Sequence, residues 1–233
     1  MRDLAPEALP LHVGFIVDGN RRWATAHGLP KLQGHKTGME NLRERVTQAR
    51  QLGIKYVSAY IFSTENWQRS AEEVAYLMDL FVWYADKELK RLATEDIRIV
   101  FLGSRDKLPE KVLVAMDRAE ARTKEAKSMT LGLCLSYGGR QELTDAVRHM
   151  VAAGEAVENI SPELIDRYLY HPEIPPVDLV IRTSGEQRIS NFMLWRIAYA
   201  ELYFIPKAWP DFGANDFVEA LAEYANRHRR IGK

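Results

Sequence analysis

The sequence is poor in cysteine and has no excess of either charge. Its 233 residues contain 32 Lys and Arg and 32 Asp and Glu, so the formal net charge is zero. The single Cys134 lies in the apolar stretch LGLCLS and excludes an intramolecular disulfide, so we interpret it as a small buried hydrophobe. Because balanced charge gives no overall field that attracts nucleic acid, we expect no nucleic-acid partner and look for anion sites in local clusters.

Long apolar runs are also missing. No stretch reaches the roughly 18 apolar residues of a membrane span, and the opening MRDLAPEALP lacks the apolar run of a signal peptide. We therefore expect a cytoplasmic protein, which leaves peripheral contact with lipid open. The sequence lacks Ser-His-Asp spacing, a Cys-His cluster, GxxxxGK[ST] and GxGxxG, which argues against nucleophilic catalysis, a P-loop and dinucleotide binding.

Apolar residues, at 46% of the chain, are ample for a buried core. Short apolar runs predict strands over residues 12–17, 56–62, 97–103, 130–136, 178–183 and 200–205. Most are apolar on successive residues, as strands covered on both faces are. Helical spacing predicts helices over residues 39–52, 72–92, 110–127, 141–153 and 215–227. We expect an α/β fold, a single domain over residues 1–233 with a mostly parallel central sheet of about six strands wrapped by helices.

The predicted helix 72–92 has two interpretations. Ser70 followed by Glu73 is a capping-box pattern that indicates where this helix begins. Its apolar stripe is typical of an ordinary core helix, and it also suits the wall of a hydrophobic tunnel beside the sheet. The residues alone favour the core helix.

Polar residues follow the first predicted strand, in DGNRRWA. Gly19 and Asn20 suit a backbone turn with positive φ, and the helix that follows offers its positive end to an anion. Arg21 and Arg22 add positive charge, whereas Asp18 suits Mg²⁺ that bridges to a diphosphate. The alternative is an Asp that caps the helix, with both arginines in solvent.

Hydrogen-bonding groups also follow the second predicted strand, in FSTENWQR, residues 62–69. An ordinary turn with a helix cap would explain them equally well. GHKTG, residues 34–38, sets His35 and Lys36 between two glycines at the start of a helix, which is another geometry that suits an anion.

The fifth predicted strand leads into IRTSGEQRISNFMLWRIAYAELYF, residues 181–204. Arg182 and Arg188 flank a Ser-Gly turn and Ser190 follows, a set that suits a diphosphate because guanidinium groups bind its oxygens in pairs. Glu201 lies in an apolar, aromatic segment, where a carboxylate is costly unless it is paired or binds a metal. These strand ends together indicate a site for diphosphate and Mg²⁺.

Five stretches together resemble the cis-prenyltransferases, the (Z)-polyprenyl diphosphate synthases that include undecaprenyl diphosphate synthase. They are HVGFIVDGNRRWA, GHKTG, YIFSTENWQR, LSYGGRQEL and RTSGEQRISNFMLWRIAYAELYF, in the order of that family's blocks, and the similarity runs from His12 to the C-terminus. The DDxxD pairs of trans-prenyl synthases are absent.

The resemblance implies a homodimer in which each monomer adds isopentenyl diphosphate to an allylic diphosphate (farnesyl, geranyl or dimethylallyl) with Mg²⁺, creating a cis double bond. It implies Asp18 and Glu201 as metal ligands, Glu201 from across the dimer interface, and a C-terminal tail (residues 230–232) that reaches the partner's site. The implied catalytic residues are Asp18, His35, Ser63 and Asn66, the last two near the reacting carbons as candidates for proton removal. The implied substrate-binding residues are Gly19, Asn20, Arg21, Arg22, Trp23, Lys31, His35, Ser63, Thr64, Glu65, Trp67, Arg69, Arg182, Arg188, Ile189 and Ser190.

Within that set, the Gly19 to Trp23 loop, His35 and Arg69 would hold the allylic diphosphate. Arg182, Arg188 and Ser190 would hold the diphosphate of isopentenyl diphosphate.

Two residues depart from the family's pattern. Lys31 stands where the family often has an Arg on phosphate, so it keeps the charge and loses the paired donors. Ile61 replaces an Ala that is common in long-chain members at the tunnel wall, and predicts a product shorter than undecaprenyl. A non-catalytic partner subunit and a phosphate-binding module without turnover are the rival functions; retention of Asp18 and Asn66 disfavours the first.

Overall fold

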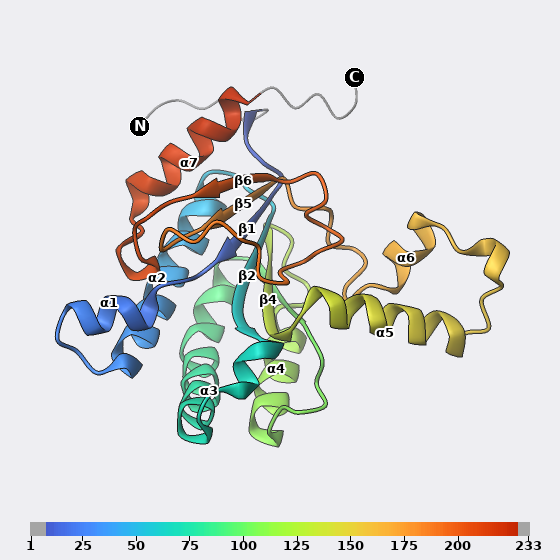
Figure 1. The fold of residues 1–233 in the computed structure, drawn as a ribbon, viewed down its shortest axis with the longest axis horizontal. Coiled ribbons are helices and arrows are strands. Elements are labelled where there is room, and N and C mark those ends of the chain that lie inside the picture. The colour runs from blue at the N-terminus through green and yellow to red at the C-terminus, as the bar shows by residue number, and fades with distance from the viewer. Residues whose placement is uncertain (1–7, 228–233) are drawn as a thin grey trace.

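Six strands form one parallel sheet at the centre of the molecule (Figure 1). The computed structural model describes residues 8–227. The strands are β1 (His12–Ile16), β2 (Tyr56–Ser63), β3 (Ile97–Leu102), β4 (Met129–Tyr137), β5 (Leu179–Arg182) and β6 (Glu201–Phe204). Their order is β3-β4-β2-β1-β5-β6, and every neighbouring pair is parallel. The predicted fold class is confirmed, and each strand begins and ends within one residue of its prediction.

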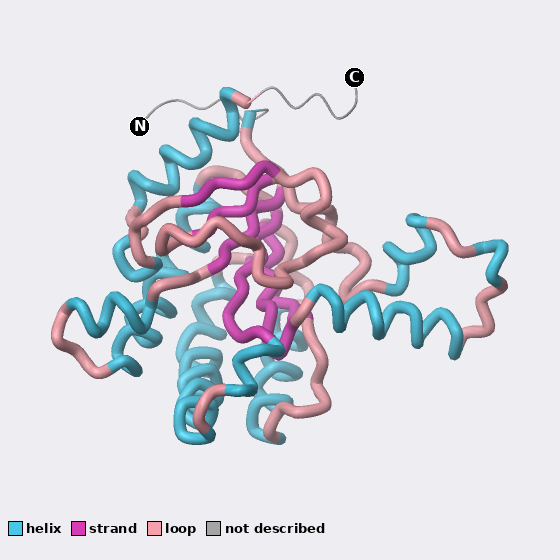
Figure 2. The backbone as a smooth tube through the Cα atoms, viewed as in Figure 1, coloured by secondary structure: helices cyan, strands magenta, loops and turns pink. Residues whose placement is uncertain are grey.

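Helices connect the strands along the chain, except that an irregular segment joins β5 to β6 (Figure 2). The α-helices are α1 (Asn20–Ala26), α2 (Lys31–Gln51), α3 (Ala71–Thr94), α4 (Glu110–Thr123), α5 (Gly139–Ala152), α6 (Pro162–Tyr168) and α7 (Ala214–Asn226). The 3₁₀ turns are η2 (Thr64–Gln68), η3 (Val157–Asn159) and η4 (Trp209–Asp211). None of the helices within residues 8–227 has the length and apolar character needed to cross a membrane.

Three helix predictions differ from the structure. Helix α4 ends at Thr123, four residues before the predicted end at 127. Helix α2 begins at Lys31, eight residues before the predicted start at 39, because Gly34 and Gly38 serve close packing and do not break the helix. A Cβ on Gly34 would lie 2.0 Å from the Asn20 carbonyl oxygen, so α1 can approach α2 only at a glycine. Helix α6 was not predicted; its seven residues are too few to show a helical period.

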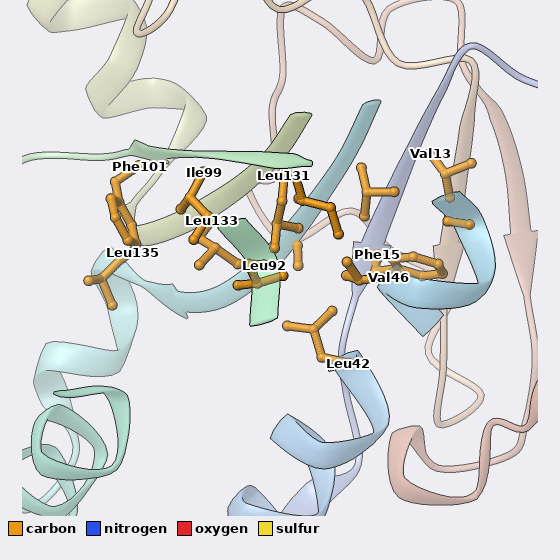
Figure 3. Close-up of a cluster of buried hydrophobic side chains, with 14 of the residues drawn as sticks. Val13, Phe15, Leu42, Val46, Leu92, Ile99, Phe101, Leu131, Leu133 and Leu135 are labelled. Carbon is orange, nitrogen blue, oxygen red and sulfur yellow. The ribbon is translucent and has the colours of Figure 1, made fainter. Parts of the chain in front are cut away.

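The main core lies on one face of the sheet, beneath α2, α3, α4 and α7 (Figure 3). Phe15 at the centre of β1 is fully buried against Trp209, with ring centroids 5.3 Å apart. A second core on the opposite face contains Phe192 and Met193, both fully buried, from the irregular segment between β5 and β6. Irregular chain therefore covers part of this face, and the buried side chains hold that segment beside the carboxyl ends of the strands.

Helix α3 begins as its capping pattern predicts, since the Ser70 side chain accepts a hydrogen bond from the Glu73 amide at 3.3 Å. Helices α5 and α6 extend from the body of the molecule, joined by η3 (Figure 1).

Candidate active site

Asp18 lies directly beyond β1, where its backbone turns sharply. Gly19 has φ of 98°, a left-handed conformation that side chains disfavour, and a Cβ there would come within 2.8 Å of the Ser184 hydroxyl. This turn lets the Gly19 amide donate to Asp18 Oδ1 at 2.7 Å. Arg22 donates to the same oxygen at 3.2 Å, and Arg182 donates to Oδ2 at 2.9 Å. The carboxylate is therefore fixed between two arginines from separate strand ends.

Parallel pairing brings the three polar strand ends together, as the sequence predicts. Strand β1 lies between β2 and β5, with Ile16 aligned with Tyr60 on one side and with Arg182 on the other. Residues that follow β1, β2 and β5 therefore share one edge of the sheet, where open parallel sheets bind their ligands.

Two polar cavities meet at Asp18. The β5-side cavity, of about 510 Å³, is lined by Ile16, Val17, Asp18, Tyr60, Ser63, Glu65, Asn66, Arg182, Ser190 and Asn191. The α1-side cavity, of about 640 Å³, is lined by Val17, Asp18, Gly19, Asn20, Arg21, Arg22, Thr25, Ala26, Lys31, His35 and Arg69. Val17 and Asp18 line both, so one carboxylate faces two neighbouring sites.

Arg182 organises the β5-side cavity. Its side chain is only 4% exposed, and Nη1 donates to Ser190 Oγ at 2.8 Å and to the Arg188 carbonyl. On the facing strand end, Asn66 Oδ1 accepts the Ser63 amide at 3.1 Å in a capping box that fixes η2. The cavity thus combines a buried guanidinium with two hydroxyls and an amide.

Glu73 pairs with two arginines of the α1-side cavity and lies close to His35. It accepts Arg69 at 2.9 Å and lies 3.5 Å from Arg21 and 3.8 Å from His35 Nε2. Burial, with the charges of Arg69 and Arg21, lowers the pKa of His35 to about 4, so this imidazole is neutral at neutral pH. Burial also lowers the pKa of Arg69. Lys31, the first residue of α2, adds a further positive charge to this cavity.

An apolar chamber adjoins the α1-side cavity, with which it shares Val17, Asn20 and His35. Ile61 and Leu77 line this near chamber, and Phe81 lines both it and a far chamber of the same kind. Each chamber has a volume of about 50 Å³, room for a few water-sized molecules. The walls must therefore move apart to admit a hydrocarbon chain.

Several predicted site residues have structural partners and line neither of these two polar cavities. Trp67 donates to Ser136 Oγ at 3.0 Å, and Trp23 donates to Asp211 at 2.7 Å. Thr64 donates to Glu65 at 3.2 Å.

In the loop after β5, Arg188 is 60% exposed and pairs with Glu186 at 2.5 Å. Ile189 packs against the second core. Substrate contacts by these residues, as by Trp23, Trp67 and Thr64, stay predictions.

Glu201 lies far from Asp18 within one chain. It begins β6 and aligns with Leu179, the first residue of β5, whereas the cavity begins beyond Arg182 at the other end of that strand. Its carboxylate accepts Arg227 at 2.9 Å. A metal site that uses both carboxylates therefore requires a second copy of the chain. The predicted tail, residues 230–232, lies outside the described residues.

Sequence reasoning missed three residues that organise the site. Glu73 was interpreted only as part of a cap, and Glu186, which pairs with Arg22 at 3.0 Å, was not singled out. Asn191 donates to Glu65 at 3.0 Å across the β5-side cavity. A carboxylate among clustered arginines was the available signal for the two glutamates.

The donor set suits Mg²⁺ only when phosphate takes part. Within residues 8–227 no group of three or more His, Cys, Asp or Glu side chains is arranged to hold a metal. Mg²⁺ commonly takes one or two carboxylates and completes its shell with water and substrate phosphates. Asp18, 29% exposed and facing two cation-lined cavities, fits that pattern.

Similarity to known proteins covers nearly the whole chain. The family model described as "Putative undecaprenyl diphosphate synthase" matches residues 16–232. The chain is 49% identical over 227 residues to an isoprenyl transferase of Thermotoga maritima, covering 96% of this chain and 97% of that protein. It is 40% identical over 233 residues to a ditrans,polycis-undecaprenyl-diphosphate synthase ((2E,6E)-farnesyl-diphosphate specific) of Vibrio vulnificus, covering 98% and 93%. The crystal structure of lavandulyl diphosphate synthase from Lavandula x intermedia in complex with dimethylallyl diphosphate superposes with a TM-score of 0.94 at 36% identity, covering 97% and 100%.

Proposed function

The chain belongs to the undecaprenyl diphosphate synthase family of prenyltransferases, and on that basis we propose how its two cavities divide the work. It is an enzyme that elongates prenyl diphosphates, which disfavours the alternative of a non-catalytic partner subunit. Asp18 at the junction of two cation-lined cavities is the observation that carries the proposal. One cavity takes the allylic diphosphate and the other takes isopentenyl diphosphate.

The α1-side cavity suits the allylic substrate because it adjoins the near apolar chamber. Its diphosphate would meet the Gly19 to Trp23 loop, Lys31 and Arg69, while the hydrocarbon chain enters between Ile61 and Leu77. A neutral His35 stands where the polar and apolar parts meet and can hydrogen-bond a phosphate oxygen without adding charge. The substrate's polar head and apolar tail thus match the two adjoining spaces.

The β5-side cavity suits isopentenyl diphosphate. Arg182 donates to Ser190 Oγ at 2.8 Å, which supports their joint role in binding an anion, and the exposed Arg188 adds charge nearby. Ser63 and Asn66 line this cavity from the end of β2. With isopentenyl diphosphate in this cavity, the five-carbon substrate would lie beside the allylic carbon that it attacks.

The reaction joins a carbon of isopentenyl diphosphate to the allylic carbon, breaks the allylic carbon–oxygen bond, and releases diphosphate and one proton. Mg²⁺ held by Asp18 would supply charge that stabilises the departing diphosphate. Arg69, which is part-buried, and the exposed Arg21 and Arg22 would stabilise the same developing charge. Ser63 and Asn66 are the groups placed to orient the proton that leaves.

Product length follows from the near chamber. Ile61 contributes a branched side chain to its wall, which Leu77 and Phe81 on α3 also line. This supports a (Z)-polyprenyl diphosphate product shorter than undecaprenyl.

The remaining assignments rest on the family resemblance. We propose a homodimer in which the partner's Glu201 completes the metal site, because Glu201 is remote from Asp18 within one chain. A single catalytic domain over residues 1–233, a cytoplasmic location and peripheral membrane contact during product release also stay predictions, as does the preference among farnesyl, geranyl and dimethylallyl diphosphates.

Substitution of Asp18 tests its proposed role as a metal ligand between the two cavities. Asp18→Ala should lower kcat by at least about a hundredfold, the cost of one preorganised transition-state contact. Asp79→Ala is the matched control, because Asp79 is 62% exposed on α3 and pairs only with Lys111 in the described contacts. Near-normal kcat in Asp18→Ala, with saturating substrates and Mg²⁺, would remove the metal-ligand role.

A further inference from the structure

A strained turn follows β5 at the edge of the site. Ser190, Asn191 and Met193 have φ of 47°, 65° and 37°. Three of the four residues 190–193 therefore adopt a left-handed backbone, although none of them is glycine. Each such conformation costs about 1 kcal/mol or more, and it persists only where contacts with the surrounding structure hold it in place. The turn is anchored from below by Phe192, whose ring would lie 2.9 Å from a Cβ on Gly14.

Asn191 fixes this turn to two other segments. Its Nδ2 donates to Glu65 Oε1 at 3.0 Å, and its Oδ1 accepts the Arg140 amide at 2.9 Å. Its carbonyl accepts the Gly139 amide at 2.7 Å. The amides of residues 139 and 140 open α5 and have no carbonyl partner within that helix, so Asn191 supplies acceptors that the helix start needs.

The fit around Asn191 is close. A Cβ on Gly138 would lie 2.7 Å from Asn191 Nδ2, so the amide can occupy this position only beside a glycine. One side chain therefore joins the ends of β2 and β5 to the start of α5.

We infer that Asn191 is a positioning residue that sets Ser190 and Arg182 against the end of β2, and so places isopentenyl diphosphate relative to the allylic substrate. Ser190 precedes it directly and accepts from Arg182, which holds Asp18. Glu65 on the other side belongs to η2, next to Asn66. We call the hydrogen bonds of Asn191 to Glu65, Gly139 and Arg140 the clamp. Loss of the clamp frees Ser190 and leaves the residues of the α1-side cavity in place. The inference rests on the proposed assignment of the β5-side cavity.

One substitution, with a matched control, separates the effect of the Asn191 side chain from that of its backbone conformation. Asn191→Gly keeps the left-handed backbone accessible and removes both side-chain hydrogen bonds. It should raise the KM for isopentenyl diphosphate about tenfold, the scale of one or two lost hydrogen bonds, and leave the KM for the allylic diphosphate unchanged. Asn159→Gly, at an exposed asparagine in η3, is the control and should change neither constant.

A donor–acceptor swap tests the contact with Glu65 directly. Asn191→Asp opposes two carboxylates and should raise the KM for isopentenyl diphosphate, whereas adding Glu65→Gln restores one donor and one acceptor. The double variant should recover most of the loss, beyond the sum of the single effects. Normal KM in Asn191→Gly, equal rises for both substrates, or no recovery in the double variant would each overturn the inference.

Binding of inorganic diphosphate, measured by calorimetry with Mg²⁺, keeps the two claims distinct. If the wild type binds diphosphate without turnover, the proposed function fails while the clamp is still tested. Weaker binding in Asn191→Gly, with an unchanged melting temperature, then supports the clamp, and equal binding rejects it.

Discussion

Arg182→Lys tests how the site uses a guanidinium group. Arg182 reaches in two directions, with Nη2 on Asp18 at 2.9 Å and Nη1 on Ser190 at 2.8 Å. A lysine keeps the positive charge, but its single ammonium group cannot serve both sides at this spacing. Either the Asp18 carboxylate or the Ser190 hydroxyl loses its partner.

The magnitude follows from those contacts. A hydrogen bond between charged groups contributes about 1.5–3 kcal/mol, and a bond to a hydroxyl about 1 kcal/mol. The loss of one side, together with poorer diphosphate binding, should cost about 3 kcal/mol, which corresponds to about a hundredfold in kcat/KM for isopentenyl diphosphate. Because Arg182 is buried, the melting temperature should also be recorded.

Steady-state kinetics with one substrate varied and the other saturating measures the effect. Arg118→Lys is the control, since Arg118 is 54% exposed on α4 and pairs with Asp86 at 2.7 Å away from the cavities. It should retain wild-type kinetics. If folded Arg182→Lys kept kcat/KM within a few-fold of wild type, the paired-donor role of Arg182 would be refuted.

Three further predictions concern length, pH and metal. Ile61→Ala should lengthen the product by at least one isoprene unit, seen by chromatography; unchanged length would mean that the near chamber does not limit growth. His12 and His35 have pKa values lowered by burial to about 4, so the folded state loses up to about 3 kcal/mol for each as pH falls from 6.5 to about 4. Urea unfolding should show this loss, and His35→Gln should remove about half of it; a flat pH profile would contradict the buried neutral state. Chelation of divalent ions should abolish turnover and Mg²⁺ should restore it, whereas full activity in excess chelator would exclude the metal.

The strands and the meeting point of their ends could be predicted from the sequence. Runs of successive apolar residues marked the strands, and parallel pairing then required that Asp18, Asn66 and Arg182 share one edge. Such predictions need only local patterns and one topological rule.

Partners across long sequence separations could not be predicted in this way. Asn191 meets Glu65 126 positions away, and Glu73 meets Arg21 from another helix. The local sequence does not identify the distant partner of either side chain, although a carboxylate near clustered arginines was a signal at Glu73. Glu201 was singled out from its apolar surroundings in the sequence. Its position at the start of β6, at the opposite end of the strands from Asp18, became clear only from the strand pairing.

The most direct measurement is turnover by the purified protein with Mg²⁺, labelled isopentenyl diphosphate and, in parallel, dimethylallyl, geranyl and farnesyl diphosphates. The two-cavity account predicts a ladder of elongated (Z)-prenyl diphosphates that ends below undecaprenyl and disappears in Asp18→Ala. No elongated product with any of the three primers, from folded protein, would contradict it.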